Sequence, residues 1–83
     1  MTGTQVRKAR TTLGRMWGLE RPLTAAELGR ILRFKRRDPG ATVLAWENGD
    51  SVPGPVSLAI ELMLAGAMPP KLGDTVRGYK GNL

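Results

Sequence analysis

The chain has 83 residues and a net charge of +6, with 13 lysines and arginines against 7 acidic residues. It contains no cysteine and no histidine, which excludes a disulfide framework, a thiolate metal site and histidine-based catalysis. With 41% hydrophobic residues and no apolar run near ~18 residues, we expect one small soluble domain in the cytoplasm, without a membrane span or signal peptide. We expect no catalytic residues, no metal and no cofactor, so the chain is not predicted to be an enzyme.

The positive charge is concentrated in the first half of the chain. Residues 1–37 carry ten Lys and Arg against two Glu, whereas residues 38–70 carry four acidic residues and no basic one. Such a division produces a one-sided field, which suits a polyanion such as nucleic acid. The alternative is a basic face that only keeps the protein soluble.

The first helix is predicted to follow Thr4, which we expect to be its N-cap. Apolar residues then recur at steps of three and four, as on an amphipathic helix. These residues are Val6, Ala9, Leu13, Met16 and Trp17. Gly18 and Pro22 bracket the end of this helix, and Arg7, Lys8 and Arg15 lie on its opposite face.

The second helix is predicted over residues 25–33. Its start is marked by "TAAE", a capping box in which Thr24 accepts from an amide of the first turn and Glu27 reaches back. Ala25, Leu28, Ile31 and Leu32 form its expected buried stripe.

The third helix is predicted over residues 39–48, because Asp38 is a good N-cap and Pro39 suits the first helical position. Val43 and Trp46 should face inward, and Asn48-Gly49 should end the helix. The expected outward face consists of small or aliphatic residues: Gly40, Ala41, Thr42, Leu44 and Ala45.

A fourth helix is predicted to open at Pro55 and end at Gly66, with a core face of Val56, Ala59, Ile60, Met63 and Leu64. Pro69-Pro70 and three later glycines predict an extended or flexible C-terminal tail over residues 67–83. The expected fold is therefore all-α, a compact bundle of four to five helices over residues 1–66, with no strand.

The second and third helices, joined by a basic connection, fit a helix-turn-helix with an extended turn. The connection contains Lys35, Arg36 and Arg37. An arginine fork matches the two acceptors of guanine, and a slim helix approaches base edges closely. The sequence therefore predicts DNA reading by this loop and helix together.

Three segments carry a resemblance to the Xre/Cro phage-repressor type of helix-turn-helix domain. They are "LTAAELGRIL" at residues 23–32, "TVLAWENG" at 42–49 and "PGPVSLAIELML" at 53–64. The resemblance implies that Ala41, Thr42 and Ala45 face the major groove. It also implies that Asn48, Thr24 and Ala25 contact the phosphate backbone.

The chain departs from the family pattern in two places. The family usually has glutamine where Ala25 stands, which removes one polar phosphate contact. The connection between the two helices is also longer than usual, and the extra residues fall in "RFKRRDPG". Both departures shift the expected DNA contacts towards Lys35, Arg36 and Arg37.

The sequence thus predicts a sequence-specific regulator that binds double-stranded DNA, of a mobile element or its own promoter. It would be a repressor or an activator that binds two half-sites as a homodimer, with RNA polymerase as a candidate partner. The alternative is an antitoxin or protein-interaction module of the same fold.

Several large side chains have an expected structural role. Trp46 and Trp17 are expected in the core, and Glu47 is expected to pair with Arg10 or Arg15. For residues 63–68 the sequence does not decide between a place in the core and a place on a dimer surface.

Overall fold

The chain folds into a compact all-α bundle. The computed structural model describes residues 1–35 and 37–79, and over these residues it contains five helices and no strand. The helices are α1 (Gly3–Met16), α2 (Ala25–Ile31), α3 (Pro39–Glu47), α4 (Gly54–Leu64) and α5 (Leu72–Thr75). The predicted fold class is confirmed.

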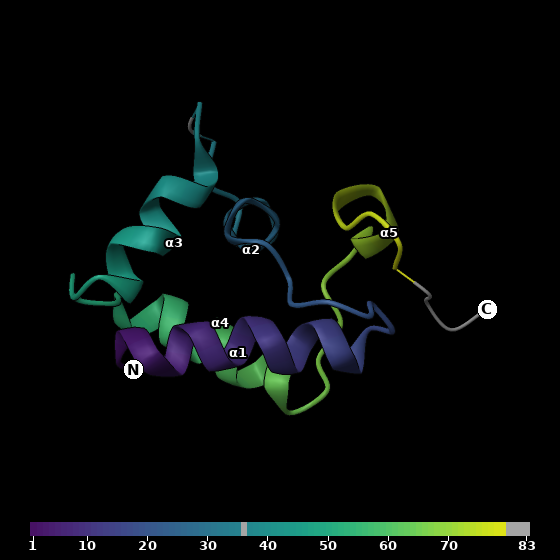
Figure 1. Cartoon of the computed structure of the whole chain (residues 1–83), viewed down its shortest axis with the longest axis horizontal. Coiled ribbons are helices and arrows are strands. Elements are labelled where there is room, and N and C mark those ends of the chain that lie inside the picture. The colour runs from purple at the N-terminus through teal and green to yellow at the C-terminus, as the bar shows by residue number, and fades with distance from the viewer. Residues whose placement is uncertain (36, 80–83) are drawn as a thin grey trace.

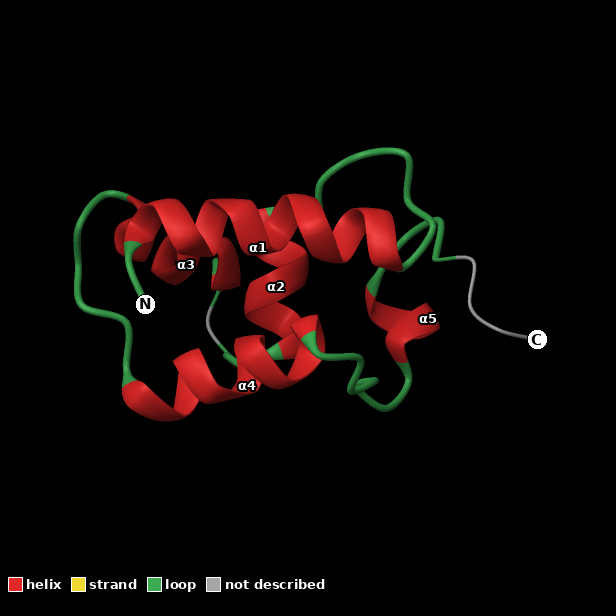
Figure 2. Ribbon diagram, turned by 90° about the horizontal axis from the view of Figure 1, so that it is seen from below, coloured by secondary structure: helices red, strands yellow, loops and turns green. Residues whose placement is uncertain are grey.

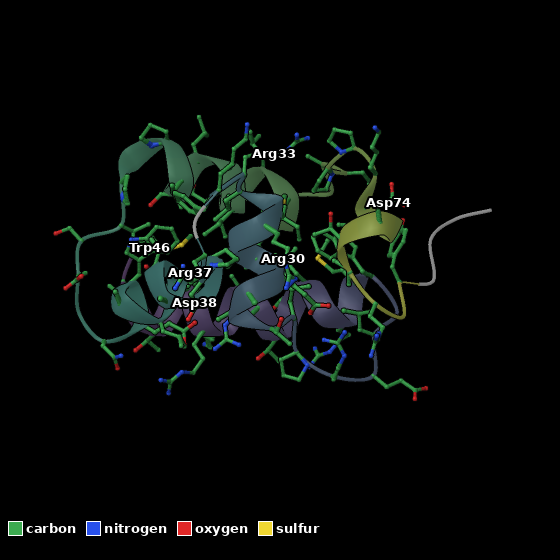
Figure 3. The ribbon with its side chains drawn as sticks, turned by 90° about the horizontal axis from the view of Figure 1, so that it is seen from above. Arg30, Arg33, Arg37, Asp38, Trp46 and Asp74 are labelled. Carbon is green, nitrogen blue, oxygen red and sulfur yellow. The ribbon has the colours of Figure 1, made fainter. Side chains whose placement is uncertain are left out.

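The two longest helices, α1 and α4, form one layer of the bundle. They run side by side and in the same general direction, as the two views in Figures 1 and 2 show. α2 lies across this pair, with α3 on one side of it and α5 on the other (Figures 1 and 3). None of the helices in the described part of the chain is long and apolar enough to cross a membrane.

α1 starts two residues earlier than the sequence predicted. Thr2, not Thr4, is its N-cap, and it forms a capping box with Gln5 because Gln5 supplies the side chain that bonds back to the Thr2 amide. Val6, Ala9, Leu13 and Trp17 are buried as expected. Met16 was wrongly assigned to the buried face, since it is 44% exposed.

α2 has the predicted capping box but ends at Ile31 rather than near Arg33. The Thr24 hydroxyl accepts from the Glu27 amide at 3.0 Å, and the Thr24 amide donates to Glu27 at 2.9 Å. Arg33 adopts a left-handed conformation with φ of 70°, and the Phe34 amide donates to the Gly29 carbonyl at 3.1 Å. This is a Schellman-type stop in which arginine occupies the position that glycine usually takes.

The first turn of α3 packs directly on α2, through two glycines. A methyl group on Gly29 would overlap the Pro39 carbonyl, and one on Gly40 would lie 2.9 Å from the Ala26 amide nitrogen. Gly40 is therefore buried, and its assignment to the outward face is wrong. Small residues at both positions let the two helix backbones approach closely.

The remaining features of α3 agree with the sequence. The Asp38 side chain accepts from the Ala41 amide at 3.2 Å, and Pro39 occupies the first helical position. Val43 and Trp46 are buried at 0% and 4% exposure. Gly49, with φ of 118°, ends the helix as predicted.

The segment after α4 differs from the expected tail. α4 begins at Gly54, one residue before the predicted Pro55, and buries Ile60 and Met63. Residues 72–75 then form α5, and Leu72 and Val76 enter the core at 4% and 1% exposure. The expectation of an extended or flexible chain is therefore wrong for this stretch, whereas residues 80–83 of the predicted tail lie outside the described residues.

Two ion-pair networks fix the helices to one another. Arg10 of α1 donates to both oxygens of Glu47 at 2.7 and 2.8 Å and to the Leu23 carbonyl at 3.1 Å. Arg7 adds a longer contact to the same carboxylate, at 3.4 Å. The pairing of Glu47 with Arg10 is confirmed, and the second partner is Arg7 rather than Arg15.

The second network ties the start of α2 to the C-terminal segment. Arg21 donates to both oxygens of Glu27, at 2.9 and 3.0 Å, and to the Arg77 carbonyl at 2.8 Å. The Arg77 amide also donates to Glu27, at 3.3 Å. Glu27 is thus a buried carboxylate with several donors around it.

Candidate nucleic-acid interface

The connection between α2 and α3 carries the basic residues that the sequence singled out. Figure 1 shows its described residues extending beyond the two helices. Lys35 and Arg37 are both exposed, whereas the predicted contact residue Arg36 lies outside the described residues. The connection therefore presents at least two cations to solvent directly ahead of α3.

Phe34 attaches this connection to the core. Its side chain is half-buried, and its ring packs against Trp46 with centroids 5.6 Å apart and a tilt of 59°. Tilted contacts of this kind are favourable between aromatic rings. The start of the basic segment is consequently held against α3, the helix that it precedes.

The outward face of α3 is slim. Ala41, Leu44 and Asn48 are exposed, and Thr42 and Ala45 are half-buried. Leu44, at 47% exposure, is the largest apolar side chain on this face. Side-chain hydrogen-bonding groups on this face are limited to Thr42 and to Asn48 at the C-cap.

The first turns of α2 and α3 lie against each other, because Gly40 packs on Ala26 and Gly29 on Pro39. The N-terminal end of a helix carries a partial positive charge and favours an anion. Figure 3 places Arg37 and Asp38 beside the first turn of α3. Two helix starts and an exposed arginine therefore share one region of the surface.

The predicted contacts at Thr24 and Ala25 are constrained by the capping box that the sequence also predicted. Thr24 is exposed, but its amide already donates to Glu27 and its hydroxyl oxygen accepts from the Glu27 amide. Ala25 is half-buried. Of these groups, the hydroxyl hydrogen of Thr24 keeps the capacity to donate to a phosphate.

The structure brings only part of the predicted set together. Arg37 and Ala41 lie at the start of α3, whereas Thr42 and Ala45 follow along the helix and Asn48 is its C-cap. This nine-residue helix is about 14 Å long, so Asn48 lies about that far from the start. A nucleic acid that touched all of these residues would have to follow the length of α3.

Two carboxylates beneath this surface stay ionised because of their donors. Hydrogen bonding from Arg10 lowers the pKa of Glu47 and outweighs the opposing effect of burial. For Glu27 burial is the largest influence and raises the pKa, but hydrogen bonds from Arg21 and Thr24 together bring it down to about 2. Both groups hold helices in place through these hydrogen bonds.

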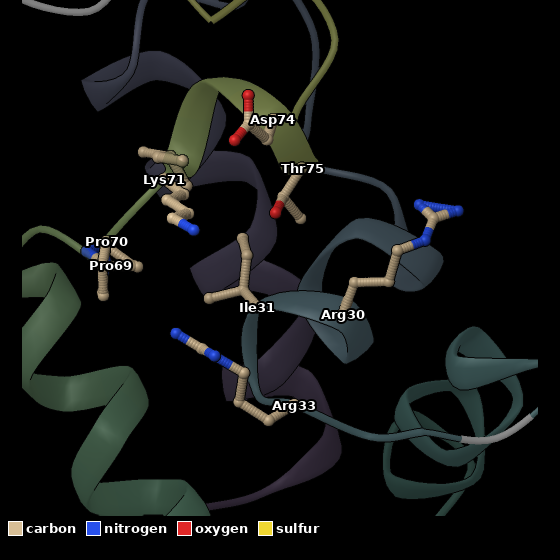
Figure 4. A pocket seen from close by; sticks show the side chains of 9 residues that line it. Arg30, Ile31, Arg33, Pro69, Pro70, Lys71, Asp74 and Thr75 are labelled. Carbon is tan, nitrogen blue, oxygen red and sulfur yellow. The ribbon is translucent and has the colours of Figure 1, made fainter.

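Sequence reasoning missed a second group of cations on the other side of α2. Arg30 of α2, Arg33 after it and Lys71 before α5 line one cavity (Figure 4). The sequence predicted Arg33 as the last residue of the second helix, and only the backbone geometry shows that it lies in a left-handed stop beyond Ile31. Lys71 could not be linked to it without the position of α5.

Three comparisons with known proteins were negative. No family model matches the chain, no curated protein matches it, and no solved structure matches its fold. The resemblance to the Xre/Cro pattern consequently depends on the motifs alone.

Proposed function

We propose that the chain is a sequence-specific regulator that binds double-stranded DNA, with α2 and α3 acting as a helix-turn-helix of the Xre/Cro type. The observation that carries the proposal is the exposed basic connection directly ahead of α3, a helix with a slim outward face. B-DNA has a major groove ~12 Å wide, which admits one α-helix. Such a regulator would act in the cytoplasm.

The proposed division of roles follows from the side chains. Ala41, Leu44 and Ala45 allow α3 to approach base edges but offer no hydrogen bonds. At least one of Arg36 and Arg37 supplies the missing base contact, because a guanidinium matches O6 and N7 of guanine. Lys35, Thr24 and Asn48 are assigned to the phosphate backbone.

A homodimer on two half-sites is the proposed assembly. Leu58 and Leu62, four residues apart on α4, are 58% and 51% exposed, and Met68 is 53% exposed. Of residues 63–68, Met63 is core and Met68 is surface. We assign this apolar face of α4 to the second copy of the chain.

The same apolar face favours the second candidate function, an antitoxin or protein-interaction module. In that case α4 would contact a different protein, and DNA binding would be weak or absent. RNA polymerase is a candidate partner only within the first function. The two functions are separated by measuring DNA binding directly.

The test starts with selection of duplexes from a random library, followed by fluorescence anisotropy on the selected and a scrambled duplex. We expect tighter binding to the selected duplex. If five or six cations per subunit neutralise phosphates, the log–log slope of affinity against salt should be roughly −5 per subunit. Equal affinity for both duplexes, or no dependence on salt, would refute the proposed function.

A further inference from the structure

A cavity of about 240 Å³ lies between the C-terminal end of α2 and the start of α5. Ile31 and Leu72 form part of its wall, and Pro69-Pro70 closes one side. It lies on the far side of α2 from α3 (Figures 3 and 4). The cavity is therefore separate from the surface proposed to read DNA.

Cations dominate the polar lining of this cavity. Arg33 and Lys71 extend towards the same space beside Ile31 in Figure 4, while the guanidinium of Arg30 points outward at the edge. The one acidic residue of the lining, Asp74, directs its carboxylate away from Arg33. Within the described part of the chain, none of the three cations is ion-paired with a carboxylate.

The two converging cations share an unusual backbone conformation. Arg33 has φ of 70° and Lys71 has φ of 57°, and they are the only non-glycine residues with positive φ among the described residues. Side chains in this region carry a steric cost that glycine avoids. Strained residues of this kind cluster at functional sites, where the side chain is needed despite its cost.

An ordinary structural role explains only half of this observation. Arg33 follows the C-terminus of α2, where a positive charge is favourable. Lys71 precedes α5, so a helix C-terminus does not account for its charge. A shared role in the cavity accounts for both residues, for their direction and for the absence of a carboxylate between them.

We propose that this cavity is a binding site for a phosphate group, held by Arg33 and Lys71, with the Thr75 hydroxyl as a further donor. The volume is below the ~300 Å³ at which sites for drug-sized ligands begin, so it suits a phosphate or diphosphate rather than a whole nucleotide. Arginine and lysine are the side chains that bind phosphate most strongly. The proposal does not require that the chain bind DNA.

Two kinds of ligand carry a phosphate group that would suit Arg33 and Lys71. One is the phosphate of a small phosphorylated metabolite, and the other is a backbone phosphate of DNA that extends past α2. The experiment uses inorganic pyrophosphate as the probe, followed by calorimetry and by the amide NMR signals of Arg33 and Lys71. We expect one saturable site, with signal changes confined to the residues that line the cavity.

The variants Arg33→Gly and Lys71→Gly separate loss of the site from loss of the fold. Each removes one cation and also relieves a left-handed backbone, so the melting temperature should stay or rise by a few degrees. Affinity for pyrophosphate should nevertheless fall about tenfold or more in each, because a charge-assisted contact is lost. The control is Lys8→Gln, which removes an exposed cation of α1 outside the cavity and should leave affinity for pyrophosphate unchanged.

The two sources are then distinguished by competition with the selected duplex. Displacement of pyrophosphate by DNA assigns the site to a backbone phosphate, and simultaneous binding assigns it to a free phosphorylated ligand. Unsaturable binding of pyrophosphate, or equal losses in Arg33→Gly and Lys8→Gln, would overturn the proposal. If no duplex binds, the proposed function fails, while the titration with pyrophosphate alone still decides this site.

Discussion

Arg10 and Glu47 form a two-pronged ion pair that joins α1 to the last turn of α3. The Arg10 guanidinium donates from two nitrogens to the two carboxylate oxygens, at 2.7 and 2.8 Å, and its third nitrogen reaches the Leu23 carbonyl. The Glu47 side chain is only 2% exposed and that of Arg10 17%. This pair therefore sets the position of α3, the helix proposed to enter the groove, relative to the rest of the bundle.

Replacing Glu47→Gln should destabilise the protein by about 3 kcal/mol, because it leaves the largely buried Arg10 without its carboxylate. Urea unfolding followed by tryptophan fluorescence measures this change. In Arg7→Gln, the matched control, we expect a loss of stability below about 1 kcal/mol. Arg7 is 68% exposed, and its contact to the same carboxylate is longer, at 3.4 Å. Equal losses in the two variants would show that the buried pair has no special role.

The close contact between α2 and α3 predicts that stability is sensitive to the size of the side chain at position 40. Gly40→Ala places a methyl group 2.9 Å from the Ala26 amide nitrogen, and neither backbone can move without shifting its helix. We expect a loss of about 1–3 kcal/mol in the free energy of unfolding, and weaker DNA binding because α3 is displaced.

Gly54→Ala is the control for this substitution. Gly54 opens α4 and has no atom within 4 Å of an added methyl group, so alanine should be neutral or slightly stabilising. Thermal melting of both variants makes the comparison. A Gly40→Ala protein as stable as Gly54→Ala would mean that the two helices are not in close contact.

Glu27 predicts how stability depends on pH. Its pKa is about 2 in the folded protein against an ordinary value of 4.5, so the folded state favours the ionised form. The resulting stabilisation is complete above about pH 4.5 and is lost as the pH falls towards 2, with a total of at most about 3 kcal/mol. Urea unfolding at a series of pH values measures it.

Glu27→Gln should therefore lower stability at pH 7 and flatten the decline between pH 5 and 2. Some decline should remain, because the pKa of Glu47 is also lowered. Glu61→Gln changes an exposed carboxylate of α4 and should retain the wild-type curve. If the Glu27→Gln curve were as steep as that of wild type, the network around Arg21 would not contribute to acid sensitivity.

Much of the fold was predictable because its signals are local. The caps at Thr24–Glu27 and Asp38–Pro39 depend on residues within one turn of each other, so a short stretch of sequence contains the whole interaction. The burial of Trp46 follows from periodicity and size.

The errors have two kinds of physical cause, a local choice between two caps and contacts made by distant parts of the chain. Thr2 and Thr4 are equally good caps, and only the glutamine at position 5 favours the first of them. Gly40 has no side chain, so hydrophobicity cannot assign it to a face, and its burial depends on the approach of α2. Leu72 directly precedes Gly73 and Val76 lies two residues before Gly78, and the core that accepts both is formed by distant parts of the chain.

The sequence predicted which residues belong to the candidate site but not how they lie relative to one another. The exposure of Lys35 and Arg37 follows from charge, and the structure agrees. The Thr24 amide already donates within its own capping box. This weakens the phosphate contact that the family resemblance implied. The cavity at Arg33 and Lys71 required tertiary structure, because its two cations lie in different elements.

The connection ahead of α3 is proposed to recognise the DNA sequence through an arginine. If Arg36 or Arg37 contacts guanine through its planar fork, replacing that residue by lysine keeps the charge but loses the two parallel hydrogen bonds. Binding to the selected duplex should weaken by about 1–3 kcal/mol more than binding to a scrambled duplex. Preference at one base position of each half-site should also relax.

Lys35→Gln provides the contrast, because a cation that contacts only phosphate contributes equally to both duplexes. This variant should weaken the two complexes by the same factor and reduce the salt slope by about one. Anisotropy titrations of Arg36→Lys, Arg37→Lys and Lys35→Gln at one salt concentration make the comparison. Should both arginine variants keep the wild-type ratio of specific to non-specific affinity, the connection would only hold the backbone. Base reading would then have to come from Thr42, Ala45 and Leu44, the side chains that α3 itself turns outward.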